Sequence, residues 1–364
     1  MRVAIIAPPW VAVPPPAYGG TENVLDTLAR GLEHAGHDVL LCTTGDSTCP
    51  VPRAAHFERA AGIAPANGGL LELRHVIAAY ESAAGYDIVH DHTLAGPIYA
   101  AGFVDRPVVT TNHGPFSEGL DEYYRALAGR IPVIAISHAQ ARTAGDLPLA
   151  GVVHHGIDPA RFPQGDGRGD YAVFLGRITA SKGAHVAAQV ALTAGIPLII
   201  AGKCEEPQEI AYFTEHVKPL LGGRVEFIGE ADRKTKLDLL GGARCLLNPI
   251  AWSEPFGLVM IESLACGTPV VATRQGAAPE IIDDGVTGLL ADDHLGLVRA
   301  VEAAAGLDRS QCRRAAEERF SAERMVAEHL CIYQHVICDH LAAKAADGRR
   351  GVVVSDRSQG HAAG

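Results

Sequence analysis

Paired cysteines are missing from this sequence. Its eight cysteines are scattered along 364 residues, and none belongs to a Cys-x-x-Cys motif. A disulfide-stapled secreted scaffold and a cysteine-rich zinc module are therefore disfavoured. Several of these cysteines stand in apolar segments, so we expect reduced thiols in the core of a cytoplasmic protein.

Long hydrophobic runs and an excess of positive charge are lacking too. The apolar run at residues 3–7 stops at Pro8, too early for the core of a signal peptide, and no run is long enough to cross a bilayer. The chain has 31 basic and 42 acidic residues, a net charge of −11. This balance disfavours extended nucleic-acid binding, although a local basic pocket for one nucleotide is compatible with it. We expect neither a nucleic-acid partner nor stable membrane association.

Apolar residues make up 48% of the chain, which at this length is enough for two cores. Short β-rich runs alternate with helical stretches in two series, a pattern that predicts an α/β fold of two Rossmann-like domains with parallel sheets. The predicted strands are residues 3–7, 38–43, 87–90, 108–112 and 133–137 in the first series, and 172–175, 198–201, 225–228, 245–248 and 270–273 in the second.

The passage after Val153 contains Asp158-Pro159 and the glycine-rich residues 164–169, which favours a linker there. We expect helix over residues 313–341, and a polar, glycine-rich and disordered end. The expected division is 1–160 for the first domain, 161–330 for the second, 331–346 for a C-terminal helix and 347–364 for a disordered tail.

The segment from Glu254 to Glu262 is the most informative part of the second half. It reads Glu-Pro-Phe-Gly-Leu-Val-Met-Ile-Glu, with two carboxylates on either side of the point where a helix should begin. A helix that opens near Gly257 aims unpaired N–H groups and its positive dipole end at an anion or polar ligand. Glu254 would then stand at the rim, and Glu262 could accept hydrogen bonds from ribose-type hydroxyls. Gly267 should end the helix before the next buried strand.

A second segment, residues 174–183, reads Phe-Leu-Gly-Arg-Ile-Thr-Ala-Ser-Lys-Gly. It delivers Arg177 as a bidentate fork at a strand end and Lys182 as a point charge beside a helix start. Together the two segments resemble the donor motifs of the retaining family-four glycosyltransferases. Those enzymes have the GT-B fold, in which two Rossmann-like domains face a central cleft and the last helix crosses back to the first domain.

The resemblance implies transfer of a hexose from a UDP- or GDP-linked sugar to a hydroxyl acceptor, with the α configuration retained. Arg177 and Lys182 would hold the donor diphosphate and supply the charge of a metal, so we expect no metal and no cofactor. The residues implied for catalysis are Arg177, Lys182, Glu254 and His113. Those implied for donor binding are Gly19, Gly20, Ile228, Lys236, Phe256, Gly257, Leu258, Val259 and Glu262.

The first half offers moderately specific signals for the same site. Gly19 and Gly20 follow a proline run and allow backbone amides to approach an anion, but the third glycine of a dinucleotide fingerprint is missing, which disfavours a nicotinamide enzyme. A purely structural turn stays open. His113 follows a predicted strand and matches the family histidine near the donor sugar. Residues 90–92, His-Asp-His, allow a metal site, although hydrogen-bonded structural histidines are commoner.

One departure from the family and three other functions stay open. The loop that begins with Arg274 and Gln275 departs from the family, which usually has two adjacent glycines before the proline, and its added side chains could narrow the approach to the phosphates. A sugar-nucleotide epimerase would need acid/base carboxylates in the first domain. A catalytically silent sugar-nucleotide-binding module would keep the cleft, and a phosphorylase would need a pyridoxal lysine and a longer chain. Residues 53–85 balance three arginines against three glutamates, so we expect a soluble acceptor.

Overall fold

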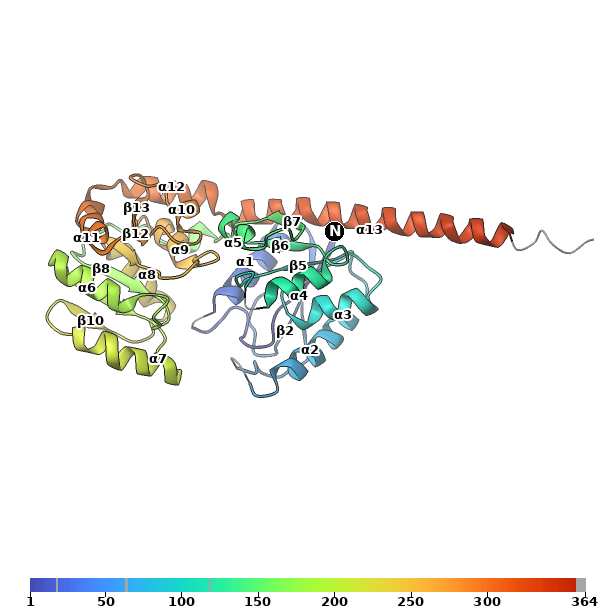
Figure 1. Ribbon diagram of the computed structural model, residues 1–364, viewed down its shortest axis with the longest axis horizontal. Coiled ribbons are helices and arrows are strands. Elements are labelled where there is room, and N and C mark those ends of the chain that lie inside the picture. The colour runs from blue at the N-terminus through green and yellow to red at the C-terminus, as the bar shows by residue number, and fades with distance from the viewer. Residues whose placement is uncertain (18, 63–64, 118, 358–364) are drawn as a thin grey trace, which may run out of the picture.

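The computed structural model describes residues 1–17, 19–62, 65–117 and 119–357, with side chains described up to residue 346. Two parallel sheets lie in two lobes side by side, each covered by helices (Figure 1). The expected boundary at residue 160 lies in the segment that joins the two sheets. Every strand pair within the sheets is parallel, which confirms two Rossmann-like domains.

The first sheet has seven strands in the order β3-β2-β1-β4-β5-β6-β7. Its central strands are buried at nearly every position, as expected for strands covered on both faces. The strands are β1 (Arg2–Ile6), β2 (Asp38–Thr43), β3 (Arg53–Ala55), β4 (Ile88–Asp91), β5 (Val108–Thr111), β6 (Val133–Ala135) and β7 (Leu149–Val152). The helices are α1 (Gly20–His34), α2 (Gly68–Ser82), α3 (Ala95–Phe103), α4 (Leu120–Leu127) and α5 (His138–Thr143).

The second sheet has six strands in the order β10-β9-β8-β11-β12-β13. A short 3-10 turn, Pro159–Arg161, precedes it. The strands are β8 (Ala172–Leu175), β9 (Leu198–Ala201), β10 (Val225–Phe227), β11 (Cys245–Asn248), β12 (Val270–Thr273) and β13 (Gly288–Ala291). The helices are α6 (Ala184–Ala194), α7 (Pro207–Tyr212), α8 (Arg233–Gly242), α9 (Leu258–Ala265), α10 (Ala278–Ile281), α11 (His294–Ala303) and α12 (Arg309–Arg319).

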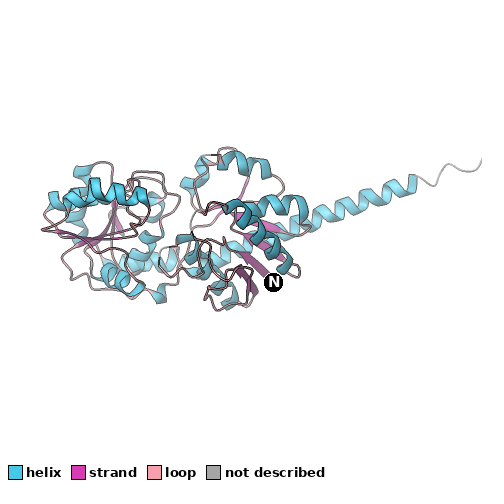
Figure 2. Ribbon diagram, turned by 90° about the horizontal axis from the view of Figure 1, so that it is seen from below, coloured by secondary structure: helices cyan, strands magenta, loops and turns pink. Residues whose placement is uncertain are grey.

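Helix α13 (Ala322–Arg357) returns from the second lobe and runs along the first (Figures 1 and 2). Met325, Val326 and Tyr333 are buried in the core of the first domain with strands β1, β4 and β5. The helical region expected over 313–341 is two helices, because the chain bends at Phe320, whose φ of −132° is not helical. The C-terminal helix expected at 331–346 lies within α13.

The prediction that residues 347–364 form a disordered tail is corrected in part. Residues 347–357 continue α13, whereas 358–364 lie outside the described residues. Residues 342–346 are alanine-rich, and extending a helix that has already formed is easier than starting one. Within the described part of the chain, no helix combines the length and apolar character needed to cross a bilayer.

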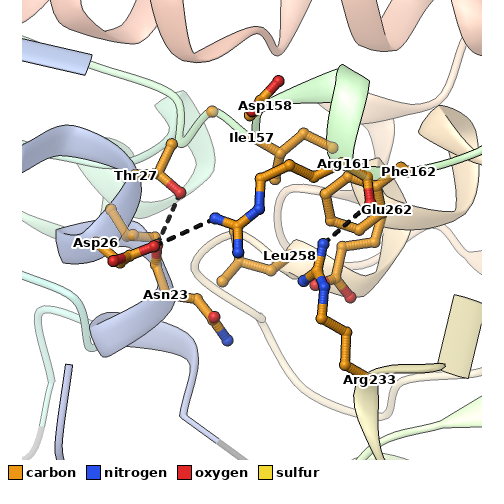
Figure 3. A pocket seen from close by; sticks show the side chains of 12 residues that line it. Asn23, Asp26, Thr27, Ile157, Asp158, Arg161, Phe162, Arg233, Leu258 and Glu262 are labelled. Atoms are coloured by element: carbon orange, nitrogen blue, oxygen red, sulfur yellow. Dashed lines mark hydrogen bonds and ion pairs between the residues drawn. The ribbon is translucent and has the colours of Figure 1, made fainter. Parts of the chain in front are cut away.

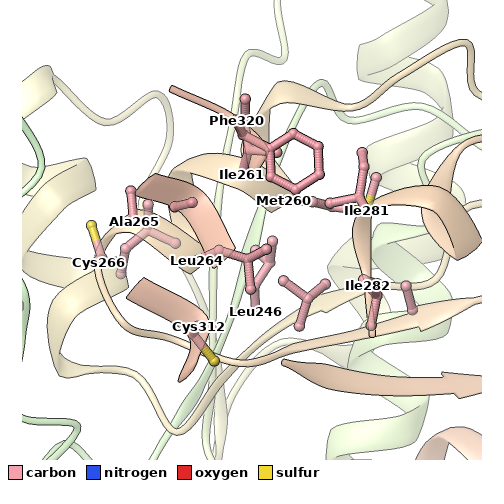
Figure 4. Close-up of a cluster of buried hydrophobic side chains, with 14 of the residues drawn as sticks. Leu246, Met260, Ile261, Leu264, Ala265, Cys266, Ile281, Ile282, Cys312 and Phe320 are labelled. Carbon is pink, nitrogen blue, oxygen red and sulfur yellow. The ribbon is translucent and has the colours of Figure 1, made fainter. Parts of the chain in front are cut away.

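Helix α9 lies at the centre of the second domain's core (Figure 4). It opens at Gly257 and is followed by Gly267 and β12, which confirms the expected order of helix, glycine and buried strand. Its buried face anchors it, since burying each large apolar side chain contributes about 1.5–3 kcal/mol. Its buried neighbours in the cluster are Leu246, Ile281, Ile282, Cys312 and Phe320. The helix therefore presents its N-terminus from a fixed base.

Candidate active site

A cleft of about 950 Å³ is lined by residues of both domains. It lies where the carboxyl ends of parallel strands meet, the position at which open α/β sheets bind ligands. Arg177 follows β8, His113 follows β5, and Glu254 follows β11. Every residue expected at the site lines this cleft except Ile228, which follows β10 and is 38% exposed. The lining set includes Gly19, Gly20, His113, Arg177, Lys182, Lys236, Glu254, Phe256, Gly257, Leu258, Val259 and Glu262.

Two helix N-termini meet across the cleft. Gly257 caps α9 with φ of 97°, in the left-handed region that favours glycine, and a Cβ there would lie 2.6 Å from Met260 Cε. Gly20 opens α1 on the other side, and a Cβ built on it would lie 3.6 Å from Leu258 Cδ1. A Cβ on Gly19 would lie 2.6 Å from Pro15 Cβ. Both helix starts, each a favourable place for negative charge, therefore line the same cleft.

Lys182 and Glu254 form an ion pair within the cleft. Lys182 Nζ lies 2.6 Å from Glu254 Oε2 and closer still to Oε1, and the two side chains are 17% and 12% exposed. Trp252 Nε1–H donates to the same carboxylate at 3.0 Å. The loops that carry this pair are joined by a hydrogen bond from Ala251 N to Ser181 O at 2.8 Å. The carboxylate is therefore oriented by two donors, and Lys182 is held beside the α9 N-terminus.

The loop after β12 supports Glu254 from behind. Ala277 N donates to Glu254 O at 3.0 Å, and a Cβ on Gly276 would lie 2.3 Å from that oxygen. Arg274 instead pairs with Asp284 at 2.9 Å and is not among the described residues that line the cleft. The arginine that departs from the family pattern thus braces its own loop and does not narrow the cleft.

Lys236 and Glu262 form a second pair, with Nζ 2.7 Å from Oε1. The ammonium group of Lys236 lies beside the carboxylate expected to hold ribose-type hydroxyls. Each glutamate of the motif is thus paired with a lysine, Glu254 with Lys182 and Glu262 with Lys236.

A bridge between the domains borders this site (Figure 3). Arg161 donates to Asp26 Oδ2 at 3.2 Å, Arg30 donates to the same carboxylate at 2.9 Å, and Arg233 donates to the Arg161 carbonyl oxygen at 2.9 Å. Asp26 is 2% exposed, and both of its charged partners are partly exposed. Sequence reasoning missed this bridge, because single charges on α1 and in the linker form no motif.

A group of packed histidines lies at the first domain's side of the cleft, with His113 and His155 in its lining and His92 buried. His92 Nδ1 and His113 Nε2 are hydrogen-bonded at 2.8 Å, and the His113 ring stacks on His155 at 5.3 Å between centroids. His155 in turn meets Phe256 edge-on at 5.0 Å. Burial lowers the pKa of His113 to about 4, with a smaller effect from His329, so the imidazole is neutral near pH 7. Its Nδ1 is the nitrogen left for a ligand.

The first histidine of the His-Asp-His segment, His90, has a structural role. Both ring nitrogens of His90 are used, Nδ1 with the Tyr333 hydroxyl and Nε2 with Thr111 Oγ1, each at 2.7 Å. Neither lone pair is left for a metal. Among the described residues, the side chains grouped closely enough to hold an ion are His138, His154 and Glu280. There Glu280 accepts from His154 Nε2 at 2.9 Å and from the backbone N–H of His138 at 2.8 Å, which links the domains.

Two family models cover this arrangement. "Glycosyltransferase Family 4" matches residues 18–161, and "Glycosyl transferases group 1" matches residues 160–318. The chain is also 30% identical over 347 residues to alpha-maltose-1-phosphate synthase of Mycobacterium tuberculosis, covering 81% of this chain and 87% of the relative. The chain is a family-4 glycosyltransferase. It has the GT-B fold that the two sheets and the central cleft define.

Other proteins similar to this glycosyltransferase carry different functional names. The phosphatidyl-myo-inositol mannosyltransferase of Mycolicibacterium smegmatis is 28% identical over 334 residues, with 83% of this chain and 84% of the relative covered. The crystal structure of a glycosyltransferase involved in avilamycin A biosynthesis superposes with a TM-score of 0.69 at 26% identity. That likeness covers 93% of this chain and 98% of the other.

Proposed function

We propose that this glycosyltransferase moves a hexose from a UDP- or GDP-linked sugar to a hydroxyl acceptor, with retention of the α configuration and without a metal. The observation that supports the proposal is that Arg177, Lys182 and Gly257, the residue before α9, line one cleft together with Gly20 at the start of α1. Two cations and two helix starts supply positive charge where a diphosphate would lie.

The leaving diphosphate would gain negative charge as the bond from the sugar C1 to the phosphate oxygen breaks. Lys182 would stay paired with Glu254 and lend its positive charge to that diphosphate, and Arg177 would add a second cation at the cleft surface. Fixed charges of this kind need no reorganisation during the reaction, and each typically contributes a hundredfold or more in rate. Lys236 and Glu262 would bind the ribose side of the nucleotide.

Retention would come from a front-face reaction. The acceptor oxygen bonds to C1 on the face that the diphosphate leaves, and the departing phosphate oxygen takes the acceptor's proton. Glu254 is a poor nucleophile because Lys182 and Trp252 both bind its carboxylate. Its role would be to accept hydrogen bonds from sugar hydroxyls, so the two-carboxylate mechanism of glycosidases does not apply. Neutral His113 would offer Nδ1 to another hydroxyl.

A donor screen tests the proposal. UDP- and GDP-linked sugars are supplied one at a time, with and without a mixture of hydroxyl acceptors, and release of the nucleoside diphosphate is measured. Release that rises with acceptor supports the transferase. Conversion of the donor to its epimer without release would support an epimerase, and tight donor binding with no conversion of any donor would support a silent binding module.

A further inference from the structure

The two walls of the cleft differ in chemistry. The cations that line it all come from the linker and the second domain, namely Arg161, Arg177, Lys182, Lys203, Arg233 and Lys236. Of the described lining residues before position 160, none is a lysine or an arginine. Positive charge is therefore confined to the wall assigned to the donor.

The first domain's wall combines an apolar surface with two carboxylates. Its apolar lining residues are Trp10, Val11, Pro14, Pro15, Pro16, Ala17, Pro65, Leu94 and Ile136. Its charged lining residues are Glu22 and Glu72, each 7% exposed. Burial raises the pKa of both carboxyl groups, and backbone hydrogen bonds offset part of this effect.

Trp10 and Glu72 are fixed parts of this wall. Trp10 packs over the start of α2, where a Cβ on Gly68 would lie 3.6 Å from the indole Cη2, and its carbonyl accepts from Gly62 N at 3.0 Å. Glu72 accepts from the backbone N–H groups of Leu94 at 3.2 Å and of Ala95 at 3.1 Å. The carboxylate thus already serves the start of α3, and the indole remains as an aromatic surface within the cleft.

From these contacts we infer that the acceptor is an uncharged molecule with an apolar or aromatic face, and not a sugar phosphate or another anion. This inference rests on the proposed transferase function. Trp10 and the prolines offer a surface on which a ring can stack. A phosphate on the same wall would lose its hydration shell beside Glu22 and Glu72 without gaining a cation, and like charges placed together at an interface are strongly disfavoured.

Matched acceptors test the inference with a donor that the protein turns over. The panel compares 4-nitrophenyl β-glucoside, glucose with glucose 1-phosphate, and myo-inositol with inositol 3-phosphate, and kcat/KM is measured for each. We expect the aryl glucoside to exceed both phosphates by at least about tenfold, and each neutral sugar to exceed its own phosphate. Preference for a phosphorylated acceptor, or no transfer to the aryl glucoside, overturns the inference.

Variants test whether the first domain's wall causes the acceptor preference. Trp10→Ala should lower kcat/KM for the aryl glucoside at least about tenfold, because both the stacking contact and the buried apolar area of the indole are lost. Leu70→Ala is its control, because Leu70 is 74% exposed on α2 outside the described lining. Equal kinetics in the two variants would remove Trp10 from the acceptor site.

A substitution that adds a positive charge to this wall provides a second test. Gly69 lines the cleft and Gly102 does not, and a Cβ on either has no atom within 4 Å. Gly69→Lys should therefore move the preference toward the phosphorylated acceptors, while Gly102→Lys should leave it unchanged. The same shift in both variants, or none in Gly69→Lys, counts against the inference. Release of nucleoside diphosphate from donor alone is recorded throughout, so that a protein that processes no donor shows failure of the transferase itself.

Discussion

Replacing Lys182 with alanine is the perturbation with the clearest expected result. Lys182 Nζ lies 2.6 Å from Glu254 Oε2, and both side chains are largely buried. Loss of one cation that stabilises developing charge should lower kcat by about a hundredfold or more, equivalent to roughly 2.7 kcal/mol. The exposed pair Lys234 and Asp238 offers a control, since Lys234→Ala should leave kcat unchanged.

The same substitution also affects stability, and the two effects can be separated. Removing one partner of a buried pair costs up to about 3–5 kcal/mol, here reduced because Trp252 still donates to Glu254. The double variant Lys182→Ala/Glu254→Gln removes the uncompensated charge, so its Tm should recover while kcat stays low. The assay is nucleoside diphosphate release at saturating donor, with Tm measured in parallel. A folded Lys182→Ala protein with kcat within about threefold of the unchanged protein would refute the role of Lys182.

Three further predictions concern metal, pH and membranes. Activity should survive EDTA, because Arg177 and Lys182 supply the positive charge; loss on chelation that manganese or magnesium restores would count against this. The pKa of His113 is lowered from 6.5 to about 4, so between these pH values the unfolded chain binds more protons than the folded protein. The free energy of unfolding should therefore fall by about 3 kcal/mol for this group as the pH drops from 6.5 to 4. Urea unfolding at several pH values measures the slope, which should be shallower in His113→Gln; equal slopes contradict it. Co-sedimentation with anionic liposomes at physiological salt should stay near background, and strong salt-sensitive binding or activity only with a lipid acceptor would overturn the expected soluble acceptor.

The central strands were predictable because they are buried on both faces and read as short apolar runs. β2, β8, β9, β11 and β12 have the expected bounds. The sequence did not predict β3, β7 and β13, all of which are edge strands. β3 has only three residues, and β7 and β13 each contain a glycine, Gly151 and Gly288, a residue type that is uncommon in strands.

The site was predictable where chemistry follows a helix start or a strand end. Glycine at position 257 and the two glutamates around it are local signals, and the structure brings them together. Asp26 was missed because its partner Arg161 is 135 residues away, and the contact between His92 and His113 was missed because the two rings are 21 residues apart. Their contacts depend on tertiary packing, which no local pattern encodes. Lys236 shows the same limit, since its partner Glu262 is 26 residues away.

The stereochemistry of transfer tests the proposed mechanism most directly. With an α-linked nucleoside diphosphate sugar chosen from the donor screen, NMR of the product during the first turnovers gives the configuration at C1 before any later equilibration. The proposed front-face reaction, with Arg177 and Lys182 of the cleft stabilising the leaving diphosphate, predicts an α-linked product. A β-linked product would contradict the front-face mechanism.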